Sequence, residues 1–436
     1  MIRAAFRNRL PWIQTAGLVF LSPLLLFIRV DRWGWLLGVP ALWGISGLVR
    51  GQAFKRTPLN RPIIVIGALT LLSLAITPDM LLSLPKVASL LLGLAFFFMV
   101  VDLCETRRGI EVSLGGLVAA GAVIGVVGLL GTRWLEKSGL LSAITARLPQ
   151  LINGLPGAVE GFHPNQVAGT MLWVIPVALT LGAGLWQRPD RRRWSVVAAL
   201  AGAWMAGVLV LTQSRSGWFG MALALLGMLA AVNRRARWGL ATVGVALIAV
   251  VVLTGLDPVR PGGGDAALVG DTVGALNWDF RLEIWRVALL GIADFPFTGM
   301  GIGVFREVSW LLYAPQINPG FDIAHAHNEF LQIALDLGLL GLIAFVALYV
   351  AAFRMLRRMW RMASDPLHKT SGFPVSTSTL RLLVLGLSGG LFAHLMYSLT
   401  DAVALGAKPG VLFWVLLGLV AGLFERLQAA RSGATR

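Results

Sequence analysis

The sequence is poor in charge and almost lacks cysteine. Only 13% of its 436 residues are charged, whereas 57% are apolar. Soluble domains carry about 25% charged residues, so this composition excludes a soluble domain and indicates a protein embedded in a lipid bilayer. Cys104 is the only cysteine. No disulfide can therefore form within the chain, and the cysteine content says nothing about the redox compartment.

The sequence also lacks the alternating apolar and polar pattern of a transmembrane β-barrel. Its apolar runs are continuous and recur from one end to the other, with lengths that can cross roughly 30 Å of hydrocarbon as helices. We therefore predict an all-α polytopic membrane protein with about twelve transmembrane helices. The predicted spans are 11–28, 33–49, 62–77, 84–101, 110–130, 165–186, 195–213, 217–232, 239–256, 328–353, 382–400 and 411–427.

The formal net charge of +16 suggests a nucleic-acid partner at first sight, but the distribution of charge argues for membrane topology. With the N-terminus inside, most of the 37 Lys and Arg residues fall on the inner side and most of the 21 acidic residues on the outer side. This is the positive-inside pattern, so we predict that both termini are cytoplasmic. The basic loops contain few aromatic residues that could stack on bases, so we predict no nucleic-acid partner.

The chain is predicted to form a single integral membrane domain, 1–436, with two long segments on the outer side. The first covers residues 131–164. The second, 257–327, is a large loop that begins near the flexible stretch Pro261-Gly-Gly-Gly264 and contains short helices. Basic residues on this outer side run against the positive-inside pattern, so they are the first candidates for function.

Arg215 lies in the motif Thr212-Gln-Ser-Arg-Ser-Gly217, between two predicted spans that leave no room for a long loop. A guanidinium at the membrane boundary is costly unless it meets an anion, a carbonyl group or water. Ser214 and Ser216 open the backbone around it as in a binding turn, so Arg215 and Ser214 are candidate substrate-binding residues. The alternative is an arginine that reaches the lipid headgroups.

Two further outer arginines lie in the motif Asp279-Phe-Arg-Leu-Glu-Ile-Trp-Arg286. On a helix, Glu283 and Arg286 can pair across three residues, which leaves Arg281 as the freer cation. We therefore treat Arg281 and Arg286 as candidate substrate-binding residues, with Arg281 the stronger. A purely structural role for both arginines remains the alternative.

Two of the five histidines, His325 and His327, stand where the large outer loop enters a span, followed by Asn328. Histidine titrates near neutrality and can accept a proton from a hydroxyl group. A metal site at this pair would need more ligands, and the chain contains neither a His-Glu-x-x-His nor an Asp-x-Asp motif, so we predict no metal. The alternative is a helix cap with hydrogen-bonded histidines.

Three polar residues, His163, Asn165 and Gln166, close the first long outer segment at the same face of the membrane. Such a cluster suits sugar hydroxyls or a phosphate, but Asn at the start of a helix is also a common cap, and both interpretations stay open. Asp401 and Lys408 lie in the last outer turn. We expect them to pair with each other and to do nothing more.

Two arginines and a histidine on one face, without an acidic pair for a divalent cation, favour transfer from a polyprenyl diphosphate. Guanidinium groups can stabilise the leaving diphosphate where Mg²⁺ would otherwise act, while histidine deprotonates an acceptor hydroxyl. The glycines between Gly299 and Phe305 lack the strand and helix setting of a nucleotide-binding loop. We therefore predict neither a nucleotide nor a cofactor.

These residues resemble the O-antigen ligase family over residues 205–345. The resemblance rests on the order and spacing of Thr212-Gln-Ser-Arg-Ser-Gly217, Arg281 to Trp285 followed by Pro296-Phe-Thr-Gly-Met-Gly-Ile-Gly303, and Ala326-His-Asn-Glu-Phe-Leu-Gln332. It implies a metal-independent, inverting glycosyltransferase that joins undecaprenyl-diphosphate-linked O-antigen to the lipid A-core during lipopolysaccharide maturation.

The same resemblance implies a multi-pass protein of the bacterial inner membrane, in contact with membrane lipids, with a large periplasmic loop and a periplasmic active site. By position, His327 looks like the general base or acceptor-orienting residue, and Arg215 and Arg281 look like a diphosphate clamp. His325 has no counterpart in the family pattern, so its role stays open.

Other functions remain open on the sequence alone. An O-antigen polymerase and a protein O-oligosaccharyltransferase belong to the same superfamily. A membrane transporter is an alternative of a different class, which predicts charges near the middle of spans and a two-fold hydropathy repeat. Asp336 is the main charged residue within a predicted span, and no repeat is evident.

Overall fold

The computed structural model describes residues 2–433 apart from 135–138, 157, 234, 236, 240–277, 318–321 and 365–375. The predicted span 239–256 therefore lies outside the described residues except for Gly239. The stretch Pro261–Gly264 lies outside them entirely. The described part is helical and contains no strand, which confirms the predicted all-α class.

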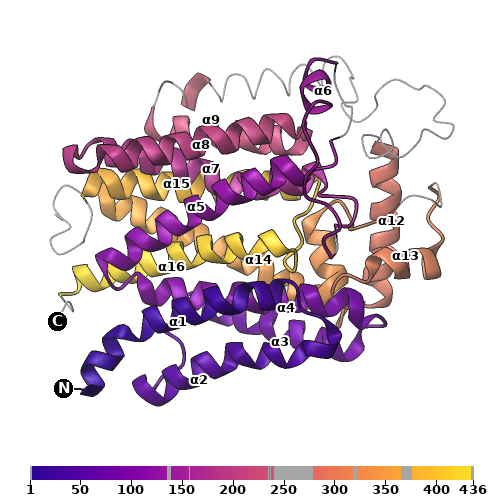
Figure 1. The fold of residues 1–436 in the computed structure, drawn as a ribbon, viewed down its shortest axis with the longest axis horizontal. Helices are drawn as coiled ribbons and strands as arrows, with labels where there is room; N and C mark the ends of the chain where they lie inside the picture. The colour runs from indigo at the N-terminus through magenta and orange to yellow at the C-terminus, as the bar shows by residue number, and fades with distance from the viewer. Residues whose placement is uncertain are drawn as a thin grey trace.

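Long helices lie side by side in a bundle, and two helices of the large outer segment, α12 and α13, lie at one end of it (Figure 1). The start of α1 and the end of α16 lie at the opposite end. The α-helices are α1 (Ile2–Leu26), α2 (Gly38–Arg50), α3 (Asn60–Ile76), α4 (Met80–Leu103), α5 (Arg107–Gly131), α6 (Gly139–Thr145), α7 (Pro164–Trp186), α8 (Arg192–Leu211), α9 (Arg215–Val232), α12 (Trp278–Asp294), α13 (Phe305–Tyr313), α14 (Glu329–Ser364), α15 (Thr377–Ser398) and α16 (Val411–Arg431).

Nine of the described helices are long and apolar enough to cross a membrane, and α3, with 17 residues, is a shorter apolar helix. The predicted span 33–49 is divided between a 3-10 helix, Val30–Leu37, and α2. The 13 residues of α2 reach only about 20 Å. The polytopic fold is thus confirmed, whereas the count of about twelve spans is not.

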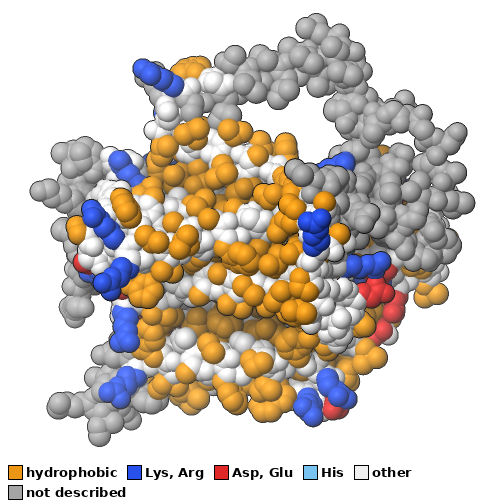
Figure 2. Space-filling view, turned by 45° about the horizontal axis from the view of Figure 1, so that its top comes forward, with side chains coloured by type: hydrophobic (Ala, Val, Ile, Leu, Met, Phe, Trp, Pro, Cys, Tyr) orange, Lys and Arg blue, Asp and Glu red, His pale blue; other side chains and the backbone are white. Residues whose placement is uncertain are grey.

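The face of the bundle seen in Figure 2 is covered mainly by apolar side chains, with Lys and Arg gathered toward its ends. Leu48 and Phe20, for example, are 90% and 69% exposed. Water-soluble monomers rarely expose apolar patches of this extent, whereas lipid tails solvate them. In contrast, α7 and α16 are buried over most of their length and form the centre of the bundle.

The α12–α13 end is fastened to the bundle through the glycine-rich turn of residues 296–303. Met300 donates its N–H to the carbonyl oxygen of Leu335 at 2.7 Å, and Leu339 donates to that of Pro296 at 2.7 Å. Gly299 has φ +70°, and a Cβ there would lie 2.6 Å from the Leu335 oxygen, so only glycine allows this approach. The turn therefore fixes the outer helices against the first half of α14.

Candidate active site

The two histidines of the outer loop lie directly before α14 and are both buried. The Oδ1 atom of Asn328 accepts the N–H groups of Phe330 and Leu331, so Asn328 caps the helix. Nδ1 of His325 accepts the N–H of His327 at 3.1 Å. The cap expected as an alternative is therefore present, but Asn328 forms it, while the imidazole of His327 points elsewhere.

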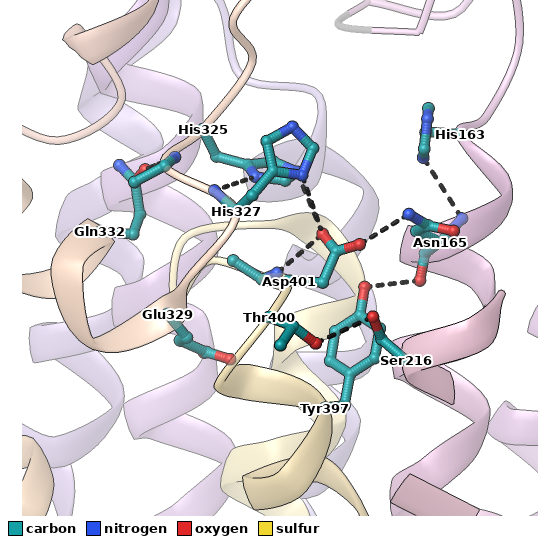
Figure 3. Close-up of polar contacts among 12 residues, drawn as sticks. His163, Asn165, Ser216, His325, His327, Glu329, Gln332, Tyr397, Thr400 and Asp401 are labelled. Carbon is teal, nitrogen blue, oxygen red and sulfur yellow. Dashed lines mark hydrogen bonds and ion pairs between the residues drawn. The ribbon is translucent and has the colours of Figure 1, made fainter. Parts of the chain in front are cut away.

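Asp401 lies at the centre of the cluster (Figure 3). It follows α15 and is fully buried. Its Oδ1 is 3.5 Å from Nδ1 of His327 and 3.8 Å from Nε2 of His325, and its Oδ2 accepts a hydrogen bond from Asn165 at 2.6 Å. Asp401 is therefore surrounded by donors from distant segments of the chain and does more than the sequence predicts.

The predicted pair between Asp401 and Lys408 is wrong. Nζ of Lys408 instead donates to the carbonyl oxygen of Pro156 at 2.5 Å and lies 4.5 Å from the ring centroid of Phe27. The turn after α15 directs the short aspartate into the buried cluster, where it gains several donors, whereas the long lysine side chain reaches the backbone at Pro156. Nothing near Asp401 in the sequence signals this, because its partners come from other parts of the chain.

Arg281 extends from α12 into the same cluster. Its Nη1 donates to the carbonyl oxygen of Thr400, and its Nη2 is 3.9 Å from Oδ2 of Asp401. The ring of His327 meets the ring of Phe280 edge-on, with centroids 5.8 Å apart. Arg281 and His327 therefore share Asp401 as a neighbour.

Arg286 does not join the cluster, because it forms a two-pronged pair with Glu283, at 2.8 and 2.7 Å. This confirms the pairing predicted from their spacing. The hydrogen bonds from Arg286 lower the pKa of Glu283, which also accepts the N–H of Gln316. The pair thus anchors the loop that follows α13 to α12.

Arg215 is the first residue of α9 and is exposed. Ser214 precedes it as the N-cap and uses its hydroxyl to accept the N–H of Gly217 at 3.3 Å. Ser216 meets the site, because its hydroxyl accepts a hydrogen bond from that of Thr400 at 2.9 Å. Thr400 is thereby bound to both arginine-bearing segments, α9 and α12.

The polar residues at the start of α7 divide into a cap and a site residue. His163 caps the helix through Nδ1, which accepts the N–H of Asn165 at 3.3 Å. Asn165 reaches Asp401, and its carbonyl oxygen accepts the hydroxyl of Tyr397 at 2.7 Å. The carbonyl oxygen of Gln166 accepts the hydroxyl of Thr170 within α7. Asn165 thus contacts the cluster directly through Asp401.

The charges of the cluster follow from burial and from its neighbours. Burial would raise the pKa of Asp401, but the hydrogen bond and charge of His327 and the charges of His325 and Arg281 outweigh it and hold this pKa far below its usual range. Burial and the neighbouring His327 lower the pKa of His325 to about 3. At neutral pH, Asp401 is therefore ionised and His325 is neutral.

The same three side chains could also hold a metal ion. One ligand atom each from His325, His327 and Asp401 lies within 4.8 Å of the others, so our reason for predicting no metal, the lack of further ligands, is wrong. Two imidazoles and a carboxylate are a common ligand set. However, the guanidinium of Arg281 lies 3.9 Å from Asp401 and would repel a divalent cation.

Comparison with known proteins agrees with the resemblance seen in the motifs. Residues 200–346 match the family model described as O-antigen ligase. An O-antigen ligase of Pseudomonas aeruginosa is 25% identical over 308 residues, which cover 69% of this chain and 66%, or just under two thirds, of that protein. The family match contains Arg215, Arg281 and His327 but ends before Asp401. The motifs, the helical membrane fold and these matches together support a resemblance of the chain to the O-antigen ligase family.

Proposed function

We propose that this protein is an O-antigen ligase that transfers a glycan from undecaprenyl diphosphate to the lipid A-core oligosaccharide. The observation that carries the proposal is the contact of Asp401 with both His327 and Arg281, in a buried cluster at the α12–α13 end of a membrane bundle. Both substrates are lipids, and an apolar face of the bundle, seen in Figure 2, lets them approach from the bilayer.

His327 acts as the general base in this proposal. Ionised Asp401 lies on the Nδ1 side of its ring, so an Nδ1–H would face the carboxylate and Nε2 would be left to accept a proton. The acceptor hydroxyl gives its proton to Nε2 as its oxygen bonds to the anomeric carbon. The bond from that carbon to the phosphate oxygen breaks on the opposite face, which inverts the configuration and releases undecaprenyl diphosphate.

Arg281 and Arg215 stabilise the charge that develops on the leaving diphosphate. The contacts of Arg281 with Thr400 and Asp401 orient its guanidinium in advance. Arg215 begins an 18-residue helix, where the backbone N–H groups and the helix dipole also favour an anion. Because Thr400 binds both Arg281 and Ser216, it sets the distance between the two cationic segments.

The catalytic core extends beyond the predicted region 205–345, because Asn165 and Asp401 complete the cluster. His325, Asn328 and Asn165 lie where they can orient sugar hydroxyls, whereas Ser214, His163, Gln166 and Arg286 support the surrounding backbone. We place the α12–α13 end in the periplasm and both termini in the cytoplasm, in the bacterial inner membrane, as the positive-inside pattern indicates.

Deletion of the gene tests the proposal at the level of the cell. A ligase predicts that lipopolysaccharide loses all core-linked polymer while lipid-linked polymer accumulates. Core capped with a single repeat would instead identify a polymerase. Unchanged lipopolysaccharide together with altered solute uptake would identify a transporter, and glycan lost from proteins alone would identify a protein oligosaccharyltransferase.

A further inference from the structure

The backbone of His327 adopts a conformation that non-glycine residues rarely take. Its φ is +46°, in the left-handed region. A residue with a Cβ persists there only when its surroundings hold it, and such residues concentrate at functional sites. The contacts that hold this backbone therefore also determine where the imidazole of His327 points.

The N–H group of the residue before His327 is hydrogen-bonded to a side chain in the first turn of α14. The N–H of Ala326 donates to Oε1 of Gln332 at 2.8 Å, and both residues are buried. Because Oε1 must face this donor, the amide nitrogen of Gln332 points the other way, and it donates to Oδ1 of Asp336 at 2.8 Å. One orientation of the Gln332 amide therefore satisfies both neighbours.

Asp336 connects the Gln332 amide to the glycine-rich turn and, through that turn, to α4. Its Oδ1 also accepts the N–H of Gly303 at 3.0 Å, and the carbonyl oxygen of Gly303 accepts Nζ of Lys86 on α4 at 3.3 Å. Gly303 has φ +82°, and a Cβ there would lie 2.3 Å from Nζ of Lys86, so the lysine occupies the space that a side chain would fill. Buried charged groups in a membrane bundle are expensive and are therefore expected to serve function.

We propose that Gln332 is a positioning residue for transfer, and that Asp336 sets its amide so that the backbone at His327 stays in the left-handed conformation. The chain of contacts runs from Gly303 and Asp336 through Gln332 to Ala326. This inference rests on the proposed function, because it assigns His327 the role of base. It adds residues that touch neither substrate nor the reacting atoms.

The test compares variants in a purified transfer assay with undecaprenyl-diphosphate-linked glycan and lipid A-core. Gln332→Met keeps the size of the side chain but removes both hydrogen bonds, so kcat should fall about tenfold or more, while KM for the donor changes less than about twofold. Asp336→Leu should behave in the same way. Asp336→Asn retains the oxygen that accepts from Gln332 and Gly303, so it should keep kcat within about threefold of wild type.

Gln14→Met is the matched control, because Gln14 is an equally buried glutamine of α1 whose amide forms, among the described residues, one hydrogen bond, to the carbonyl oxygen of Leu42 at 3.5 Å. It should transfer like wild type. Wild-type kcat in Gln332→Met, or equal losses in Asp336→Leu and Asp336→Asn, would overturn the inference. An inactive wild type would instead overturn the proposed function.

Discussion

Oδ1 of Asp401 lies 3.5 Å from Nδ1 of His327, although the two residues belong to different outer segments of the chain. The carboxylate is fully buried and its pKa is held low by the imidazoles and by Arg281. A fixed negative charge behind an imidazole selects its tautomer and stabilises the positive charge that forms when the ring takes up a proton.

We predict that Asp401→Asn lowers kcat of transfer by about a hundredfold or more, because the amide keeps the shape of the carboxylate but loses its charge. The measurement is the initial rate of glycan transfer by the purified variant. Lys408→Gln serves as the control from the same turn and should transfer at the wild-type rate. Equal activity of Asp401→Asn and wild type would refute a role for this charge.

Arg281→Lys should also be a poor enzyme. The guanidinium donates to Thr400 and approaches Asp401 from different nitrogens, and an ammonium cannot reproduce this fork. We expect transfer to fall about tenfold or more, with most of the loss in kcat. Arg286→Lys is the matched control. In the described part of the chain it alters the ion pair of Arg286 with Glu283, outside the cluster, so it should change transfer less than about twofold.

The low pKa of His325, about 3, predicts a particular dependence of stability on pH. Between the unfolded value near 6.5 and this folded value, the unfolded chain binds more protons at this residue, so its contribution to stability is present above the window and is lost as pH falls through it. His325→Gln should therefore lose less melting temperature than wild type between about pH 6.5 and pH 4. If the melting temperatures of wild type and His325→Gln in detergent fell equally over this pH range, that result would contradict a neutral, buried His325.

Removal of metal ions with EDTA distinguishes two ways of stabilising the leaving diphosphate, by the guanidinium groups or by a metal ion. If Arg215 and Arg281 stabilise the leaving diphosphate, EDTA should leave the transfer rate unchanged. The cluster of His325, His327 and Asp401 makes the experiment necessary, because its geometry would admit an ion. Inhibition by EDTA that is reversed by Mg²⁺, Mn²⁺ or Zn²⁺ would show that the clamp is not the only source of charge stabilisation.

The sequence predicted the membrane fold and several site segments because their signals are local. Continuous apolar runs identify spans, and the arginines of α9 and α12 were conspicuous on the outer side, where they are disfavoured. The run 33–49 does not form one continuous α-helix, because Pro40 lies in the first turn of α2, and a 3-10 helix with a non-helical φ of −122° at Arg32 precedes it. Hydropathy is averaged over a window of residues, so it does not detect such a break in the helix.

The centre of the site escaped prediction for a different reason. Asp401 gains its role from Asn165, Arg281 and His327, which only the packing of α7, α12 and α15 brings together. Likewise, the sequence shows Asp336 as a charge within a span, but its link to Ala326 through Gln332 depends on the fold of the outer loop. A single sequence contains no local pattern for contacts of this kind.

The most direct test of the account is glycan transfer by purified His327→Ala and Arg215→Ala, supplied with undecaprenyl-diphosphate-linked glycan and lipid A-core. The account predicts that both variants express and melt like wild type but produce no core-linked glycan. Transfer at the wild-type rate by His327→Ala would contradict it.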